Sequence, residues 1–269
     1  MALSRIGIIL CWSILSLCLP SCSSDKTNNS GITNWNAEEL YSEQTQRIVI
    51  EVDYQTGAEP YTTGGAFSGD PWDLFELNLK ALFNYTTSEL VVPKTLSDME
   101  ELTDITDDKF TLEEIAAIAQ KHQDTPNTDS QRVIYIVFLD GYSEDDQGNQ
   151  EEILGLSIRN TNIVAVFKPI IKTRSALYPE LAEQINVIHE VGHAVGLVNS
   201  GISMSEDHLD TQQYSGKSHC DNRDCIMYFE FEMNDNVDDR LGEILQRNSQ
   251  VLFGDECLID TEEAAGFFR

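Results

Sequence analysis

The run from Leu181 to Val198 most constrains this chain, because its apolar residues recur with helical spacing and it contains the motif H-E-V-G-H. Residues four apart lie one turn above each other on a helix, so His189 and His193 can present two imidazole nitrogens to one metal ion. Glu190 projects at a different angle and can act on a water at that metal without being a ligand. Gly196 extends the motif to H-E-x-x-H-x-x-G and is predicted to end the helix in a left-handed conformation that turns the chain back towards the metal.

A third ligand is needed to complete a catalytic metal site, and the sequence leaves several candidates. The position three residues after the glycine is Asn199, which is a poor zinc ligand. Twenty residues later comes His219, at the start of H-C-D-N-R-D-C-I-M, and this histidine is the favoured ligand. His208 lies in the intervening stretch and is the alternative, and a site with Asn199 or with no third ligand stays open.

These motifs resemble those of the metzincin metallopeptidases, whose pattern is H-E-x-x-H-x-x-G-x-x-H/D followed by a methionine turn. The segment H-C-x4-C-x-M resembles that of archaemetzincins, with an insertion of residues 199–218 before the ligand. The resemblance is specific over about 189–228. It implies that His189, His193 and His219 hold Zn²⁺, that Glu190 is the catalytic base, and that Met227 forms a hydrophobic floor under the zinc.

Six cysteines are present, and two of them, Cys11 and Cys18, lie in an N-terminal leader. Of the rest, Cys220 and Cys225 are close enough to close a short loop and would leave Cys257 over, although the other pairings are formally possible. Three cysteines are one ligand short of the usual four of a structural zinc site. Archaemetzincins bind a second zinc through their paired cysteines and a later C-x-x-C, which this chain lacks. We therefore expect a disulfide between Cys220 and Cys225.

The N-terminus has the features of an export signal. A positive residue, Arg5, precedes an apolar stretch over 6–19 that is short for a membrane-spanning helix. The sequence L-P-S-C that ends at Cys22 resembles a bacterial lipobox. We expect residues 1–21 to be a lipoprotein signal peptide, Cys22 to be lipidated, and the polar residues 22–43 to form a flexible tether. The alternative is a plain secretory signal.

The rest of the chain, residues 44–269, is predicted to form a single domain of mixed α/β (α+β) class. Alternating or continuous apolar runs predict strands over 47–54, 132–139, 152–158 and 162–167. Helices are expected over 72–83, from 111, over 181–198 and from about 237. The resemblance implies a zincin domain with a mixed sheet, a long active-site helix and a C-terminal helix. It also implies that the strand over 162–167 is the sheet edge that binds extended substrate.

The formal net charge of −29 disfavours nucleic acid as a partner, because such a surface repels phosphate backbones. Taken together, the sequence predicts a zinc-dependent metalloendopeptidase that acts on a peptide or protein substrate and is anchored to a membrane by an N-terminal lipid. The expected location is extracytoplasmic, at the bacterial outer membrane or cell surface. The alternatives are a non-catalytic binding or adhesion lipoprotein on the same scaffold, and a zinc amidase.

Overall fold

The computed structural model describes residues 35–64, 69–145, 147–211, 218–230, 237–247 and 249–267. The predicted signal peptide and Cys22 lie outside these residues. Among them, no helix is both long enough and apolar enough to cross a membrane.

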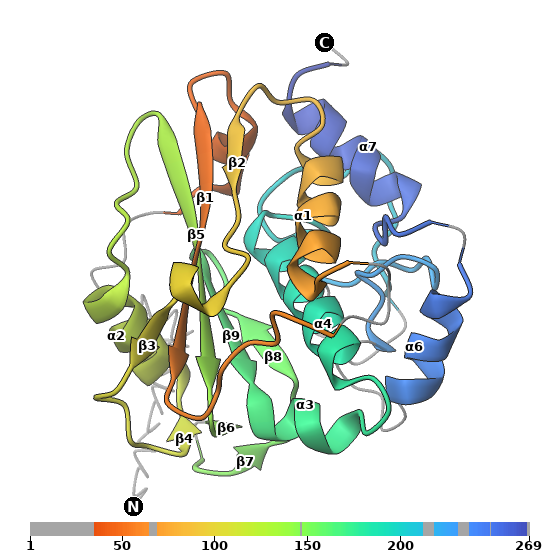
Figure 1. Cartoon of the computed structure of the whole chain (residues 1–269). Coiled ribbons are helices and arrows are strands. Elements are labelled where there is room, and N and C mark those ends of the chain that lie inside the picture. Colours follow the sequence, from red (N-terminus) through yellow and green to blue (C-terminus); the bar gives the residue numbers. More distant parts are fainter. Residues whose placement is uncertain are drawn as a thin grey trace, which may run out of the picture.

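A six-stranded mixed sheet forms the centre of the molecule (Figure 1). Along the sheet the order is β2 (Glu89–Val91), β1 (Arg47–Gln55), β5 (Gln131–Leu139), β9 (Ile163–Phe167) and β8 (Gly155–Ser157). A sixth strand, β3 (Glu100–Leu102), also pairs with β1. All the pairings are parallel except that of β8 with β9, which is antiparallel. The predicted mixed α/β class is confirmed.

The strand signals in the sequence follow from burial. The side chains from Val133 to Leu139 of β5 have no exposed surface, which explains a run of β-branched and aromatic residues without alternation. The strand expected over 162–167 lies between β5 and β8, so β8 rather than β9 forms this edge of the sheet. A second, small sheet consists of β4 (Lys109–Phe110), β6 (Tyr142–Glu144) and β7 (Gln150–Glu151).

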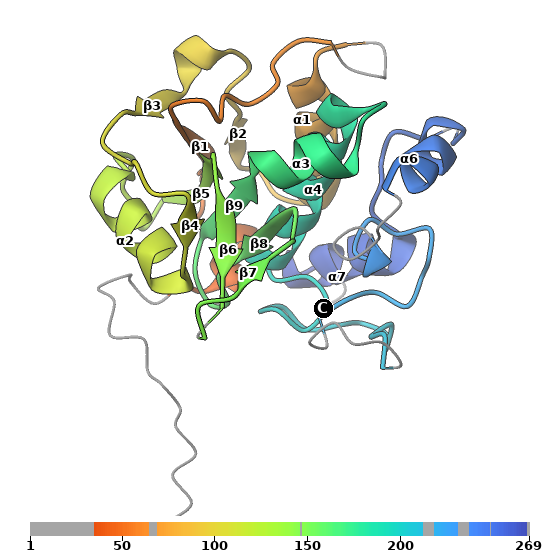
Figure 2. The ribbon, with the colours of Figure 1, turned by 90° about the horizontal axis from the view of Figure 1, so that it is seen from below.

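Helices cover both faces of the large sheet (Figures 1 and 2). Helix α2 (Leu112–His122) lies on one face, and α1 (Pro71–Leu82), α3 (Lys168–Arg174) and α4 (Pro179–Ala194) lie on the other. Two further helices, α6 (Val237–Leu245) and α7 (Asp255–Ala264), follow towards the C-terminus. The helices expected over 72–83 and from 111 begin at capping residues: Asp70 and Pro71 open α1, and Thr111 opens α2 with a capping box to Glu114.

Helix α4 is buried on nearly every side, and a buried ion pair fixes its N-terminal half. The ammonium group of Lys168 hydrogen-bonds Glu183, and both side chains are almost fully buried. Glu183 also accepts a hydrogen bond of 2.7 Å from the backbone N–H of Tyr61, whose ring lies 3.7 Å from the Lys168 nitrogen. Because breaking a buried ion pair leaves an uncompensated charge, these contacts hold α4 in one position against the sheet.

The predicted tether over 22–43 is wrong for its last nine residues, which are part of the folded domain. Residues Ala37–Tyr41 form a short 3-10 helix, η1, in which Ala37, Leu40 and Tyr41 are buried. The polar composition of the tail conceals the apolar spacing 37, 40 and 41, which is that of a helix face. Residues 22–34 of the predicted tether lie outside the described residues.

Candidate metal centre

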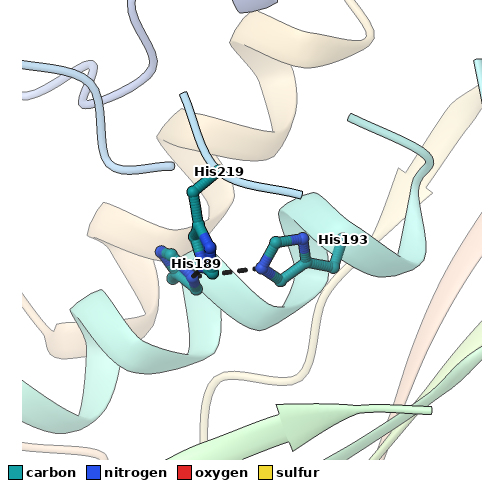
Figure 3. Close-up of side chains that lie close together, drawn as sticks. All are labelled: His189, His193 and His219. Atoms are coloured by element: carbon teal, nitrogen blue, oxygen red, sulfur yellow. Dashed lines mark hydrogen bonds between the residues drawn. The ribbon is translucent and has the colours of Figure 1, made fainter. Parts of the chain in front are cut away.

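The C-terminal half of α4 carries the two histidines of the H-E-x-x-H motif. His189 and His193 lie one helical turn apart, and their Nε2 atoms are 3.1 Å from each other (Figure 3). His189 has no exposed surface, whereas His193 is partly exposed. Glu190, between them, is 1% exposed. The helix thus presents one deeply buried imidazole and one that borders solvent.

His219 completes a group of three imidazoles. Its Nε2 lies 3.2 Å from that of His189, and the ligand atoms of the three histidines all lie within 4.8 Å of one another (Figure 3). The Nδ1 of His189 donates a 2.7 Å hydrogen bond to the backbone carbonyl of Ile226, because a carbonyl can only accept. The proton of a neutral His189 therefore sits on Nδ1, and the lone pair of its Nε2 faces the other two rings.

This arrangement fits a zinc ion. Zinc–nitrogen bonds of 2.0–2.1 Å in a tetrahedron imply about 3.3 Å between neighbouring nitrogens. The Nε2 separations of His189 from His193 and from His219, 3.1 and 3.2 Å, are close to that value. Without a metal, the single lone pair of His189 Nε2 could accept a hydrogen bond from only one of the other two rings at a time. The donor set therefore suits a catalytic centre with a fourth position left for water.

Gly196 ends the metal-binding helix as the sequence predicts, with φ = +97°. A Cβ at this position would lie 2.8 Å from the Cβ of Ala37 and 2.9 Å from the backbone nitrogen of Ile202. The segment before β1 also supplies hydrogen bonds to the end of the helix. Trp35 Nε1 donates to the carbonyl of Ala194 at 2.9 Å, and the Tyr41 hydroxyl donates to that of Val195 at 3.2 Å. The N-terminal segment therefore satisfies carbonyls that a helix end leaves without partners.

Asn199, the position of the third ligand in the metzincin pattern, does not line the cleft beside the histidines. Its backbone is left-handed, with φ = +61°, and it borders an adjoining hollow of about 390 Å³. The chain then returns to the metal centre through an antiparallel bridge between Leu209 and Cys220. His208, the alternative third ligand, lies in another cluster, described below. The structure therefore brings His219, and not Asn199 or His208, to the pair on α4.

Met227 is fully buried and packs against α4 at Gly192, between the two histidines in the sequence. A Cβ added at Gly192, between the two histidines of α4, would lie 2.3 Å from the Met227 sulfur. A glycine is therefore required at this place in the helix, because the methionine side chain occupies the volume of a β-carbon. The backbone of the same segment also contacts the ligand set: Met227 O accepts a 2.8 Å hydrogen bond from the N–H of Cys220, next to His219.

A cleft of about 200 Å³ opens beside the three histidines. It is lined by Glu190, His193 and His219 and, on the opposite side, by residues 156–161 of β8 and the turn that follows. Arg159 in that turn donates a 2.9 Å hydrogen bond to the hydroxyl of Ser218. Arg159 is the one arginine among the residues that line the cleft, and no lysine lines it, in a protein with a net charge of −29. An extended ligand would thus meet a strand edge, a guanidinium group and the histidines in one cleft.

Comparison with known proteins gives few matches. No protein-family model matches the chain, and no curated protein matches it. Two similar solved structures are archaemetzincin from Methanopyrus kandleri and a zinc-dependent peptidase from Methanocorpusculum labreanum. The first has 13% identity and a TM-score of 0.43, and the alignment covers 83% of this chain and 97% of that one. The second has 13% identity and a TM-score of 0.39, with 79% and 99% covered. Since similarity of this degree does not establish a function, the function is argued from the site itself.

A second cluster of potential metal ligands lies directly behind His219. Cys220, Cys225 and Cys257 are all buried free thiols, so the predicted disulfide between Cys220 and Cys225 is not formed. The Cys225 sulfur lies 3.6 Å from that of Cys257. The Cys220 sulfur lies 3.3 Å from Nδ1 of His208. The ligand atoms of His208, Cys220 and Cys257 are within 4.8 Å of one another.

The electrostatics of this cluster favour a charged Cys225 sulfur and a charged His208 imidazole, whereas hydrogen bonds with neighbouring thiols raise the pKa of Cys220 and of Cys257. Hydrogen bonds with Cys220 and Cys257 hold the pKa of the Cys225 thiol well below its usual value. Burial lowers the pKa of His208, but hydrogen bonds with Asp260 and Cys220 outweigh this effect and raise the pKa to about 10. His208 Nε2 lies 2.8 Å from Asp260 Oδ2.

Several residues of the site have no signal in the motifs. Trp35 lies in a polar stretch and borders the cleft. Asp260 follows Cys257 by three residues, and only the tertiary structure reveals its contact with His208. Arg159 is an ordinary turn residue in the sequence. The apolar spacing within residues 37–41 was the one sequence signal near Trp35. It indicated a short helix and gave no indication of a role at the site.

Proposed function

We propose that the protein is an exported zinc-dependent endopeptidase held at a bacterial membrane by a lipid on Cys22. The observation that carries the catalytic part is the meeting of His189, His193 and His219, with Nε2 separations of 3.1 and 3.2 Å, beside Glu190 in an open cleft. Zinc held by three imidazoles supplies a Lewis acid that lowers the pKa of a water molecule.

The side chains of the cleft have separate tasks. The Glu190 carboxylate accepts a proton from the attacking water and delivers it to the leaving amine. The edge of β8 binds the substrate in an extended conformation through backbone hydrogen bonds, since the sheet order ends at this strand. The Ile226 carbonyl holds the proton of His189 on Nδ1 and thereby fixes the ring.

The catalytic proposal is tested with Glu190→Gln. The variant keeps the shape of the side chain but cannot accept a proton. We expect peptide hydrolysis to fall by about 10²-fold or more, while zinc content, measured by metal analysis, stays unchanged. Glu180→Gln is the matched control, because Glu180 lies on the same helix in its first turn and does not line the cleft.

Two outcomes would contradict the proposal. Unchanged hydrolysis by the zinc-loaded Glu190→Gln variant would remove Glu190 from catalysis. If the zinc-loaded wild-type chain cleaves no member of a broad peptide library, a binding lipoprotein on the same scaffold becomes the better description. Cleavage restricted to N-acylated amides that are not peptides would indicate an amidase.

The lipid anchor is a separate proposal supported by the leader and the L-P-S-C sequence at Cys22. Mass spectrometry of the mature chain from a bacterial membrane fraction should find an N-terminal cysteine with acyl mass. Cys22→Ser should release the protein from membranes, whereas Cys18→Ser, four residues earlier in the leader, should not. A mature N-terminus elsewhere and without acyl mass would indicate a plain secretory signal.

A further inference from the structure

Arg159 differs from the other arginines of the described residues, because its guanidinium group is not paired with a carboxylate. The others lie within salt-bridge distance of an acidic side chain; they are Arg47, Arg132, Arg174, Arg223, Arg240 and Arg247. Arg159 has no such partner in the part of the chain that the structure describes, although the sequence has 46 acidic residues against 17 lysines and arginines. It is exposed, and it donates a 2.9 Å hydrogen bond to a neutral group, the Ser218 hydroxyl.

We propose, on the basis of the proposed peptidase function, that Arg159 selects substrates with a carboxylate close to the bond that is cleaved. A planar guanidinium group binds a carboxylate through two parallel hydrogen bonds, which a neutral amide cannot accept in the same way. Two groups of a peptide offer this chemistry, the side chain of an aspartate or glutamate residue and the C-terminal carboxylate. The shape of the cleft favours the acidic side chain.

The guanidinium group is close to the metal centre. Arg159, Ser218 and His219 all line the same cleft, and Ser218 directly precedes His219 in the chain. The Ser218 residue is 8% exposed, so the hydroxyl that accepts the hydrogen bond from Arg159 is held in place by its surroundings. Since an extended peptide advances about 3.3 Å per residue, a carboxylate bound at Arg159 belongs to a residue only a few positions from the bond that is cleaved.

The turn that carries Arg159 is fixed by backbone hydrogen bonds. The N–H of Thr161 donates to the carbonyl of Ile158 at 3.1 Å, and the N–H of Ile158 donates to the carbonyl of Ile163 at 3.0 Å. Asn160 has φ = +59°, in the left-handed region that asparagine adopts more readily than most residues. The turn follows β8, so the strand edge that binds the substrate backbone and the guanidinium group are parts of one rigid element.

A second hollow continues the cleft beyond Arg159. Arg159, Asn160 and Ser200 line both the cleft beside the histidines and the adjoining hollow of about 390 Å³. Among the described residues that line this hollow, none is acidic, and Arg159 is the one with a positive charge. Because the cleft does not end at Arg159, an extended peptide can continue past it. A C-terminal carboxylate needs no such space, whereas an acidic residue within a longer peptide does.

The first measurement is the binding of peptide pairs that differ in one residue. Amidated peptides carry Glu or Gln at each position in turn and are added to the zinc-loaded Glu190→Gln variant, which is expected not to cleave them. At one position close to the bond that the wild-type chain cleaves, the Glu peptide should bind about tenfold more tightly than the Gln peptide. The net charge of −29 repels acidic peptides at long range, so this preference cannot come from the surface as a whole.

Arg159→Gln in the same background should abolish the preference for Glu. Lys172→Gln is the matched control, because it removes the same charge from α3, at a position that does not line the cleft, and should keep the preference. Arg159→Lys should retain only part of it, since an ammonium group lacks the planar pair of donors. Equal binding of the Glu and Gln peptides at every position, or no binding of either, would overturn the proposal.

The second measurement is kcat/KM of the wild-type chain and Arg159→Gln for the same peptides. If Arg159 only supports the fold, the substitution lowers the values for Glu and Gln peptides equally, and this result would also overturn the proposal. Peptides without acidic residues, with a free or an amidated C-terminus, identify the source of the carboxylate. A preference for the free C-terminus that Arg159→Gln abolishes would replace the acidic side chain by the terminal carboxylate.

The binding measurement separates this proposal from the proposed function. A wild-type chain that cleaves no peptide would remove the peptidase function. A preference for Glu in binding that Arg159→Gln abolishes would still assign carboxylate recognition to Arg159.

Discussion

The contact between Gly192 and Met227 leads to a quantitative prediction for Gly192→Ala. A β-carbon at this position would lie 2.3 Å from the Met227 sulfur and 3.3 Å from the ring of Phe253. Overpacking a well-packed core costs about 1–3 kcal/mol, and a contact this short belongs at the upper end. Alanine favours a helix over glycine by about 1 kcal/mol. The net loss should therefore be about 2 kcal/mol.

A matched glycine separates these two effects. Gly242 lies inside α6, and a β-carbon there would meet nothing within 4 Å. Gly242→Ala should thus stabilise the protein by about 1 kcal/mol. For a domain of this size, 1 kcal/mol corresponds to about 2–4 °C in Tm. Calorimetry of the zinc-loaded proteins should give a decrease of about 4–8 °C for Gly192→Ala and an increase of about 2–4 °C for Gly242→Ala.

The same substitution should also disturb the metal, because the displaced methionine packs against α4 at Gly192, next to His193. We expect the zinc affinity of the catalytic centre, measured by chelator competition, to fall about tenfold in Gly192→Ala and to stay constant in Gly242→Ala. In a double-mutant cycle with Met227→Ala, the cost of Gly192→Ala should be smaller by at least about 1 kcal/mol. A Gly192→Ala protein that gains stability as Gly242→Ala does would refute the argument that Met227 fills this space.

Three further predictions concern other parts of the molecule. Tyr41→Phe removes the hydrogen bond to the Val195 carbonyl and should lower the free energy of unfolding by about 1–2 kcal/mol in urea denaturation. Burial raises the pKa of Asp53 to about 7 against a hydrogen bond from Tyr135 that lowers it, so the folded state binds a proton that the unfolded state releases near its usual value of 3.8. Stability should therefore decrease as the pH rises from about 4 to about 7, and Asp53→Asn should flatten this dependence in Tm measurements across that range. Arg159→Glu should lower kcat/KM about tenfold for peptides with an acidic side chain near the scissile bond and raise it for basic ones, and equal values for both peptides would exclude Arg159 from selectivity.

Local signals in the sequence predicted the elements that carry the catalytic centre. The spacing of His189 and His193 and the glycine at 196 act within a few residues, and both have the predicted conformation. Helix α4 ends at Ala194 rather than near Val198, because Gly196 and the turn after it take the chain out of the helix. His219 was predicted as the third ligand because it begins the H-C-x4-C-x-M segment.

Contacts between distant segments could not be predicted in this way. The number and spacing of the three cysteines suggested a disulfide. The structure instead shows that His208, from a long inserted segment, contacts both Cys220 and, in the last helix, Asp260. His208 and Asp260 are 52 positions apart, and nothing in the local pattern links them. Composition misled the interpretation of residues 35–43, because three buried side chains among polar neighbours are enough to fix a short segment against a helix.

The hydrogen bond from Trp35 to Ala194 also has a consequence for the order in which the protein assembles. Its partners are 159 residues apart, and the central pairings of β1 with β5 and β5 with β9 are parallel and also non-local. At 5–20 residues per second, a ribosome needs on the order of 10–30 s to make the intervening chain. Trp35 and Tyr41 emerge first and must wait for the helix whose end they complete. High contact order of this kind slows folding, so the end of the metal-binding helix should be among the last parts of the domain to become protected from hydrogen exchange.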